Sequence, residues 1–502
     1  MNANDEGLLA RIWVIESAHS IVNPKSGSGA GVGAGLDGCL HKLRKNKAIT
    51  HQDKIFAEHL LRLILKNKTR YDVLLQQFMA NIGNMPSLAM IILYAGVAQI
   101  HHMNVPNYAA VNTCVELAKH YRLGKIAGLV NAVLKKVISG ELCENMLGDA
   151  PEWLRSRLIN DYGEQVAAQI WSASLADINY VDLSFKAELS DTQMQKSSQS
   201  ALQGVLRKSS QIQDDLPEEL PIELKGEPRG ELEDELGGEL HIIGQSLRYF
   251  NVGKITELDG YNDGDWWVQD LAASLPIYGA KHLLEGKNII DLCAAPGGKT
   301  MQLAAFGGKV LAVDRSKKRL ELLDENLQRT KLQAQMQHRD LLKGGDLLKS
   351  GDLSTKYEVA QNDINQYDFV VLDAPCSATG TLRRNPDILY QLGNEDIAKL
   401  CVVQQQLLQV AASMVANGGY LLYVVCSLFK QEGEQQIETF LQQSKSTNSA
   451  YSPNSSQSFK LVQFNLPSIV LNNAGQMRTL PFLHSEHGGM DGFFAALLQK
   501  IG

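Results

Sequence analysis

Cysteine is scarce in this 502-residue sequence, long apolar runs are absent, and neither charge is in large excess. The seven cysteines are odd in number and widely spaced with no Cys-x-x-Cys pair, which argues against a disulfide framework and against a zinc site. The longest apolar stretches, such as residues 87–100, are too short to cross a bilayer, and the first residues lack a basic segment followed by an apolar run. We therefore expect reduced thiols, no bound metal, no membrane partner and a cytoplasmic location. We also expect a monomer, although no pattern in the sequence addresses the oligomeric state.

The net charge of −7 is unevenly distributed along the chain. Residues 214–239 contain 11 acidic and two basic side chains, which leaves a net charge of +2 for the rest. The overall charge therefore neither indicates nor excludes a nucleic-acid partner. Residues 190–240 are polar throughout, so we expect a disordered insert whose role the composition does not identify. Residues 442–458 are rich in Ser, Asn and Gln and predict a second polar loop.

Helical periodicity dominates the first part of the chain. Apolar residues recur at spacings of three and four in 56–65 and 111–118, which predicts an all-α domain over residues 1–150. A glycine-dense segment, residues 26–38, predicts a mobile loop between the first two helices. Basic residues gather at 42–47 and 66–70, and either a solvated surface or RNA contact would explain them. Residues 151–189 predict a helical subdomain that links this domain to the rest of the chain.

Residues 241–502 predict an α/β domain. Short apolar runs read as buried strands, helical patterns lie between them, and this alternation predicts a mainly parallel, doubly wound sheet. The predicted strands are 288–292, 309–313, 369–372 and 420–425, and the predicted helices are 316–328 and 395–416.

A glycine turn follows the first of these strands and leads into a helix that begins near Lys299. Glycine lets the backbone approach a ligand closely. A phosphate-binding P-loop would need glycine where this chain has Cys293, and the Gly-x-Gly-x-x-Gly pattern of NAD sites is absent. Asp314 ends the second strand, where it could bind ribose hydroxyls, and Asp340 follows the next apolar segment, where it could reach an adenine. These aspartates favour a nucleoside ligand, whereas helix capping is the alternative explanation, above all for Asp314.

Two thiols, Cys376 and Cys426, follow the fourth and fifth strands. Free cysteine is often only a small buried hydrophobe, but parallel sheets place their chemistry at strand ends, so we expect these two side by side above the glycine turn. One thiolate could add to carbon 6 of a cytosine and make carbon 5 nucleophilic, while the other assists proton loss and elimination. Asp373 could hydrogen-bond the base and stabilise the charge that forms.

Four strings resemble motifs of the RsmB (Sun/Fmu) family of 16S ribosomal RNA cytosine-5 methyltransferases: DLCAAPGGKT (291–300), VLDAPCSATGTLRRNPD (371–387), YVVCS (423–427) and DGFFAALLQK (491–500). The resemblance covers about residues 245–500 and implies a Rossmann-like methyltransferase domain that uses S-adenosyl-L-methionine. It implies that Cys426 is the nucleophile and that Cys376 helps to release the product. It also places a set of residues around the cofactor and the target base: Cys293, Ala294, Ala295, Pro296, Gly297, Gly298, Lys299, Asp314, Asp340 and Asp373.

Residues 105–118 and 128–136 resemble the RNA-binding NusB fold, although they would also serve as ordinary amphipathic helices. The resemblance implies small-subunit ribosomal RNA as the partner, and Arg383 and Arg384 are candidates for phosphate contact. Two departures from the family affect these expectations. Val425 replaces the usual threonine next to Cys426, and residues 182–186 replace an Arg-Val-Asn element that begins the RNA-facing subdomain.

Two other functions compete with methyl transfer. An RNA-binding or assembly factor would keep this fold without the chemistry, but both cysteines and all three aspartates are present. A nucleotide hydrolase would need a triphosphate site, which the turn does not resemble. RNA specificity lies in shape and unpaired bases, so the sequence does not identify which cytosine is modified.

Overall fold

The computed structural model divides the chain into two compact units. The helical unit comprises Met1–Asp177 and Ser377–Lys399, and the sheet unit comprises Ile178–Cys376 and Leu400–Gly502. The predicted insert 190–240, most of the glycine-dense segment and most of the polar loop 442–458 lie outside the residues that the structure describes. The described residues are 3–23, 35–79, 82–143, 146–178, 180–186, 245–250, 253–342, 366–445 and 458–501.

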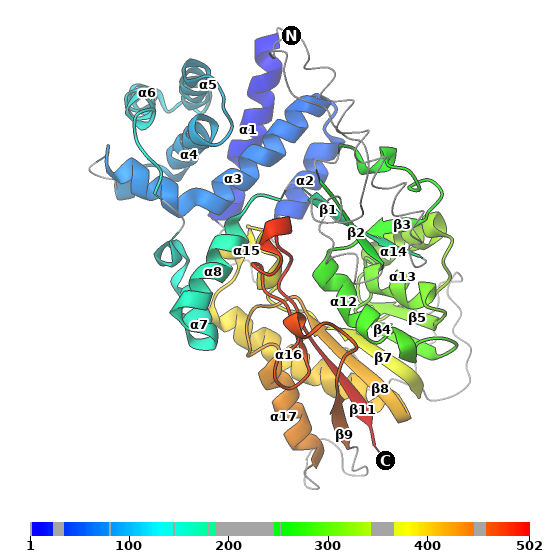
Figure 1. The fold of residues 1–502 in the computed structure, drawn as a ribbon. Helices are drawn as coiled ribbons and strands as arrows, with labels where there is room; N and C mark the ends of the chain where they lie inside the picture. The colour runs from blue at the N-terminus through cyan, green and yellow to red at the C-terminus, as the bar shows by residue number, and fades with distance from the viewer. Residues whose placement is uncertain are drawn as a thin grey trace, which may run out of the picture. The chain divides into compact units, whose positions relative to one another are not determined.

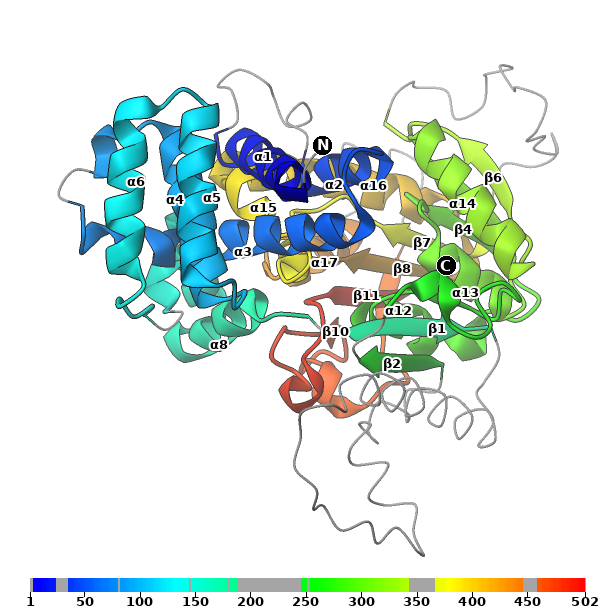
Figure 2. The same cartoon turned by 90° about the horizontal axis from the view of Figure 1, so that it is seen from above.

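The helical unit is all-α over its described residues, as the periodicity predicts. Figure 2 shows three of its helices, α4, α5 and α6, lying side by side. Helix α4 is the central one, because its residues from Ala89 to Gln99 are buried on every side. The helices are α1 (Ala3–Val22), α2 (Leu36–Lys45), α3 (His51–Gln76), α4 (Ser87–His101), α5 (Asn107–His120), α6 (Gly124–Val137), α7 (Glu152–Tyr162), α8 (Glu164–Leu175) and α15 (Ile388–Gln391), together with the start of α16 (Asn394–Ser413).

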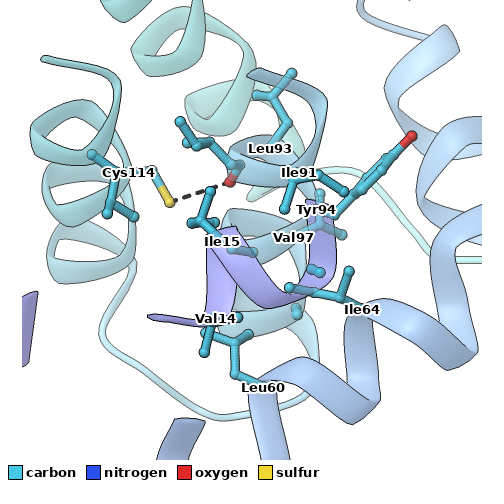
Figure 3. Packing of buried hydrophobic residues seen from close by; sticks show 14 of the residues in the cluster. Val14, Ile15, Leu60, Ile64, Ile91, Leu93, Tyr94, Val97 and Cys114 are labelled. Atoms are coloured by element: carbon cyan, nitrogen blue, oxygen red, sulfur yellow. Dashed lines mark hydrogen bonds between the residues drawn. The ribbon is translucent and has the colours of Figure 1, made fainter. Parts of the chain in front are cut away.

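Apolar side chains from helices α1 to α6 form the core of this unit, and Figure 3 shows part of it. Val14 of α1 and Leu60 of α3 pack with the α4 residues, and Cys114 of α5 belongs to the same cluster. The thiol of Cys114 donates a hydrogen bond to the carbonyl oxygen of Ile92 at 3.6 Å, and burial raises the pKa of this thiol to about 12. Cys114 is thus a packing residue, inert as a nucleophile at neutral pH.

The sheet unit contains the predicted doubly wound sheet (Figure 1). Its strand order is β10-β11-β8-β7-β4-β5-β6, with β9 paired to β11. The five strands from β8 to β6 are parallel, and β11 adds to them in the antiparallel direction. The strands are β4 (Asn288–Leu292), β5 (Lys309–Asp314), β6 (Gln335–His338), β7 (Tyr367–Asp373), β8 (Val415–Val425), β9 (Phe459–Val462), β10 (Met477–Arg478) and β11 (Phe494–Lys500).

Helices cover both faces of this sheet, which explains why its strands read as continuous apolar runs. Alternate residues of each strand, such as Ile289 and Val371, pack against α12 (Leu271–Gly279) and α13 (Gly298–Ala305). Their neighbours along the strands, such as Ile290, pack against α16 and α17 (Glu434–Lys445). Helix α14 (Lys317–Thr330) adds a further apolar cluster beside β5.

A second, three-stranded sheet has the order β2-β1-β3, with β1 (Tyr180–Phe185), β2 (Ser246–Phe250) and β3 (Trp266–Val268). The segment 182–186 that departs from the family pattern lies in and just after β1. Asp182 pairs with Arg248 of β2 at 2.6 Å, with both side chains 2% exposed, and it also accepts a hydrogen bond from the Leu271 amide at 2.9 Å. This aspartate therefore has a structural role in joining two strands to the start of α12.

The helical unit is larger than the predicted domain of residues 1–150. Helices α7 and α8 belong to it, and the buried ammonium of Lys66 donates to the Ala176 carbonyl oxygen at 2.9 Å. Residues 377–399 also belong to it, since Tyr390 donates its hydroxyl to the Leu65 carbonyl oxygen at 2.6 Å. Composition marks neither extension, because both depend on contacts between residues far apart in sequence.

Candidate active site

The turn between β4 and α13 is shaped by two residues with positive φ. Cys293 has φ of 62° and Gly297 has φ of 109°, and the peptide bond between Ala295 and Pro296 is cis. A Cβ atom on Gly297 would lie 2.1 Å from Cδ1 of Leu323 in α14. Glycine is thus required here by the backbone conformation and by α14, a reason that differs from the close ligand approach predicted from the sequence.

Asp314 joins this turn to the beginning of α14. One carboxylate oxygen accepts from the Ala295 amide at 3.1 Å, and the other accepts from the Ser316 amide at 2.8 Å. The N-cap of α14 is Ser316, not Asp314. Each oxygen of an ionised carboxylate can accept a second hydrogen bond, so these two contacts and a ligand contact are compatible. Asp340 is half-buried beyond the end of β6, and its Oδ1 accepts from the Leu342 amide at 3.1 Å.

Lys299, in the first turn of α13, forms an ion pair of 2.9 Å with Asp373 at the end of β7, the strand that neighbours β4. The lysine side chain is buried, whereas Asp373 is partly exposed. Burial, the largest single influence, lowers the pKa of Lys299, but the Asp373 carboxylate together with Cys426 and Asp291 outweighs it, so the net pKa is above its ordinary value. The lysine therefore stays charged at neutral pH, and its ammonium is directed at Asp373.

The two predicted cysteines lie side by side. Their loops follow β7 and β8, which are parallel neighbours with Asp373 opposite Val424. The Sγ atoms of Cys376 and Cys426 are 3.4 Å apart, and both cysteines are reduced and half-buried. The sequence prediction that the two motifs meet at one edge of the sheet is confirmed.

Four polar residues behind these loops were missed in the sequence analysis. Gln404, Ser427 and Glu432 are hydrogen-bonded to one another or to the cysteine loops, and Arg478 donates to the Ser427 carbonyl oxygen at 2.6 Å. Ser427 ends the YVVCS string, but no motif marks the others, because Gln404 comes from the interior of a helix and Arg478 from a two-residue strand. The only signal in the sequence is the closeness of Ser427 and Glu432 to Cys426.

Val425 is fully buried in the apolar layer between the sheet and helices α16 and α17. Cys426 packs against the cluster on the opposite face, so Val425 points away from Cys426, whereas Cys376 packs against the same cluster as Val425. A valine packs well at this apolar position, and its side chain is directed away from the thiol of Cys426.

The two arginines proposed for phosphate contact differ in exposure. Arg383 is only 2% exposed within the helical unit, whereas Arg384 is exposed. A phosphate group in solution has no access to a guanidinium buried to this extent. Arg384 is therefore the better candidate of the pair.

The described residues show no competing centre. No group of three or more His, Cys, Asp or Glu side chains is arranged there to hold a metal ion. Across the same residues, no helix has the length and apolar character needed to span a bilayer. A cavity of about 1130 Å³ lies at the other ends of the strands, beside Asn288, Lys309 and Tyr367, and none of the predicted site residues lines it.

Comparison with known proteins gives two family matches. The model described as "16S rRNA methyltransferase RsmB/F" matches residues 281–499, and the NusB family model matches residues 22–139. The chain is 30% identical over 410 residues to ribosomal RNA small subunit methyltransferase B of Erwinia tasmaniensis, covering 79% of this chain and 83% of that protein. It is 29% identical over 400 residues to the protein of the same name from Xanthomonas campestris, covering 78% and 80%.

Among solved structures, the crystal structure of PH0851 covers 100% of both chains with a TM-score of 0.65 and 20% identity, which shows a shared fold. A doubly wound sheet with a glycine turn after β4 and an aspartate at the end of β5 is a Rossmann-like domain, and the family match over residues 281–499 makes it a methyltransferase domain. Together with the NusB domain and the identity to relatives over most of their length, this places the protein in the RsmB/F family of 16S rRNA methyltransferases.

Proposed function

We propose that this protein methylates carbon 5 of a cytosine in 16S ribosomal RNA, through a covalent bond between Cys426 and carbon 6 of that base. The observation that carries the proposal is the 3.4 Å separation of the Cys376 and Cys426 Sγ atoms. Two thiols this close can both reach one base, and attack and release are separate steps that use them differently.

S-adenosylmethionine fits the residues at the neighbouring strand ends. The turn from Cys293 to Lys299 would hold it, with Asp314 and Asp340 as acceptors for its ribose and adenine. A triphosphate fits less well, because the Lys299 ammonium is 2.9 Å from a carboxylate oxygen of Asp373. When bound, S-adenosylmethionine supplies an electrophilic methyl group.

The protein's own groups then have distinct tasks. The Cys426 thiolate adds to carbon 6, which makes carbon 5 nucleophilic. Asp373 accepts a hydrogen bond from the exocyclic amino group of the base, and Lys299 holds that carboxylate in place. After methylation, Cys376 takes the proton from carbon 5, the bond between carbon 6 and sulfur breaks, and its electron pair returns to Cys426.

The test compares three cysteine variants in transfer of a tritiated methyl group from labelled S-adenosylmethionine to 16S RNA. We expect Cys426→Ala to abolish transfer, and Cys376→Ala to accumulate a protein–RNA adduct visible as a shifted band on a denaturing gel. Cys143→Ala, at a half-buried thiol in the helical unit, is the control and should retain activity. Wild-type activity in both site variants would refute the mechanism.

The competing function is an RNA-binding factor without chemistry, and an absence of labelled methyl groups in RNA would favour it. If transfer occurs, bisulfite sequencing of 16S RNA from cells with and without the protein should reveal one lost 5-methylcytosine. That position would identify the target base.

The exposed Arg384 is the phosphate-contact candidate, and Arg384→Ala should weaken RNA binding most at low salt.

A further inference from the structure

Two buried polar side chains link the loops that carry the thiols. Gln404, from α16, and Glu432, after β8, are both 0% exposed. The side-chain amide nitrogen of Gln404 donates to the Pro375 carbonyl oxygen at 3.0 Å and to Oε1 of Glu432 at 2.9 Å. Pro375 directly precedes Cys376, so this amide is connected to the loop of the first thiol.

The second carboxylate oxygen of Glu432 contacts the other loop. It accepts the Ser427 hydroxyl at 2.5 Å, and Ser427 directly follows Cys426. The same hydroxyl oxygen accepts from the Phe429 amide at 3.1 Å, while Tyr423 donates its hydroxyl to the Glu432 carbonyl oxygen at 2.7 Å. One carboxylate thus joins the two loops through a single amide and a single hydroxyl.

The orientation of the Gln404 amide is fixed by its surroundings. Both of its contacts are acceptors, so rotation of the amide would bring its oxygen against two other oxygens. Its Oε1 atom is buried and has no hydrogen-bond partner among the described residues. The amide therefore keeps one orientation, although its oxygen accepts no hydrogen bond from the described residues. The hydrogen bond to Glu432 helps to fix this orientation, because hydrogen bonds to a carboxylate are stronger than those between neutral groups.

We propose that Gln404 and Glu432 are positioning residues that hold Cys376 and Cys426 at the separation which attack and release require. The catalytic meaning of this inference rests on the proposed function, but the geometry of the thiols can be tested without RNA. Gln404 bonds directly to the Cys376 loop, and Glu432 bonds to the residue after Cys426. Loss of the Gln404 amide should therefore slow release more than attack.

The first experiment measures disulfide formation between the two thiols in the full chain, with diamide as oxidant and mass spectrometry as readout. A bond of about 2.05 Å needs only a short approach from 3.4 Å, so the wild type should form it readily. Gln404→Met keeps the side-chain length and removes both hydrogen bonds, and we expect disulfide formation to slow about fivefold or more. Gln409→Met, at an exposed glutamine on the same helix, is the matched control and should match the wild type.

The second experiment measures single-turnover methyl transfer and the amount of protein–RNA adduct. We expect Gln404→Met to accumulate adduct as a partial copy of Cys376→Ala, with release slowed about tenfold, since a misplacement of about 1 Å can cost up to a hundredfold. A merely structural residue would lower all rates and the adduct together.

Unchanged or faster disulfide formation in Gln404→Met would overturn the inference. If this variant does not fold, Ser427→Ala removes one hydroxyl from the same network and should also slow formation of the disulfide. An unchanged rate of disulfide formation in Ser427→Ala would again contradict the inference. Absence of methyl transfer in the wild type would refute the proposed function instead, and the disulfide measurement would still test the positioning.

Discussion

Asp291 is a deeply buried carboxyl beneath the glycine turn. It accepts the Thr300 hydroxyl at 2.6 Å, and its other oxygen has no hydrogen-bond partner among the described residues. Burial, followed by the charges of Asp373 and Asp314, raises the pKa of Asp291 to about 7. A raised pKa means that the folded state binds this proton more tightly than the unfolded state does. The protonated carboxyl therefore contributes to the free energy of unfolding. This contribution is complete below about pH 4 and is lost as the pH rises through about 7.

We predict that Asp291→Asn removes this pH dependence. Between pH 4 and pH 7 the free energy of unfolding of the wild type should fall relative to the variant by about 3 kcal/mol, because a pKa unit corresponds to about 1.4 kcal/mol. Urea unfolding at a series of pH values measures the difference, and Asp263→Asn, at an exposed position, is the control. Parallel stability curves for wild type and Asp291→Asn would contradict the assignment.

Gly297 gives a second prediction at the residue scale. Gly297→Ala places a methyl group 2.1 Å from Leu323 on a backbone with φ of 109°, so we expect a loss of about 1–3 kcal/mol and a lower melting temperature. The neighbouring Gly298→Ala is a matched control, since its Cβ would meet Gln269 at an ordinary 3.4 Å. Equal melting temperatures for the two variants would show that the turn relaxes around the methyl group.

At the scale of elements, local patterns predict four adjacent strands of the large sheet, β8, β7, β4 and β5, but neither its other four described strands nor the small sheet. Strands such as β4 and β7 are apolar runs buried on both faces, and that pattern is visible in the sequence. The pairing of β1 with β2 depends on Asp182 and Arg248, which lie 66 positions apart with a polar insert between them. Two opposite charges at that separation have no local signature, so only the folded chain reveals their pairing.

Arg248 is the element-scale test. Arg248→Met leaves the Asp182 carboxylate buried without its partner and removes donors to the carbonyl oxygens of His487 and Gly489, so we expect a loss of about 3–5 kcal/mol. Chemical denaturation measures it. Lys254→Met, which breaks an exposed ion pair, should cost less than about 1 kcal/mol. The double variant Asp182→Leu/Arg248→Met should recover part of the loss, and no recovery would mean that the carbonyl contacts dominate.

At the scale of the whole molecule, the two units are interleaved in sequence. The chain completes the helical unit with residues 377–399, directly after Cys376, and then returns to the sheet unit at Leu400. Asp387 shows how this late segment supports the early helices: its carboxylate accepts from the Leu36 amide at the start of α2, at 2.9 Å. The helical unit therefore depends on residues that are about 350 positions from its second helix.

Asp387→Ala tests this dependence in the full chain. The substitution leaves the buried Leu36 amide without its acceptor, at a cost of about 1–3 kcal/mol, so we expect the amides of α2 to exchange with deuterium about tenfold faster. Asp396→Ala is the control, because that carboxylate accepts from the Gly393 amide within the same late segment. Hydrogen exchange read by mass spectrometry on peptides of Leu36–Lys45 distinguishes the two variants. Protection of α2 that is equal in Asp387→Ala and wild type would mean that the late segment packs on the early helices without stabilising them.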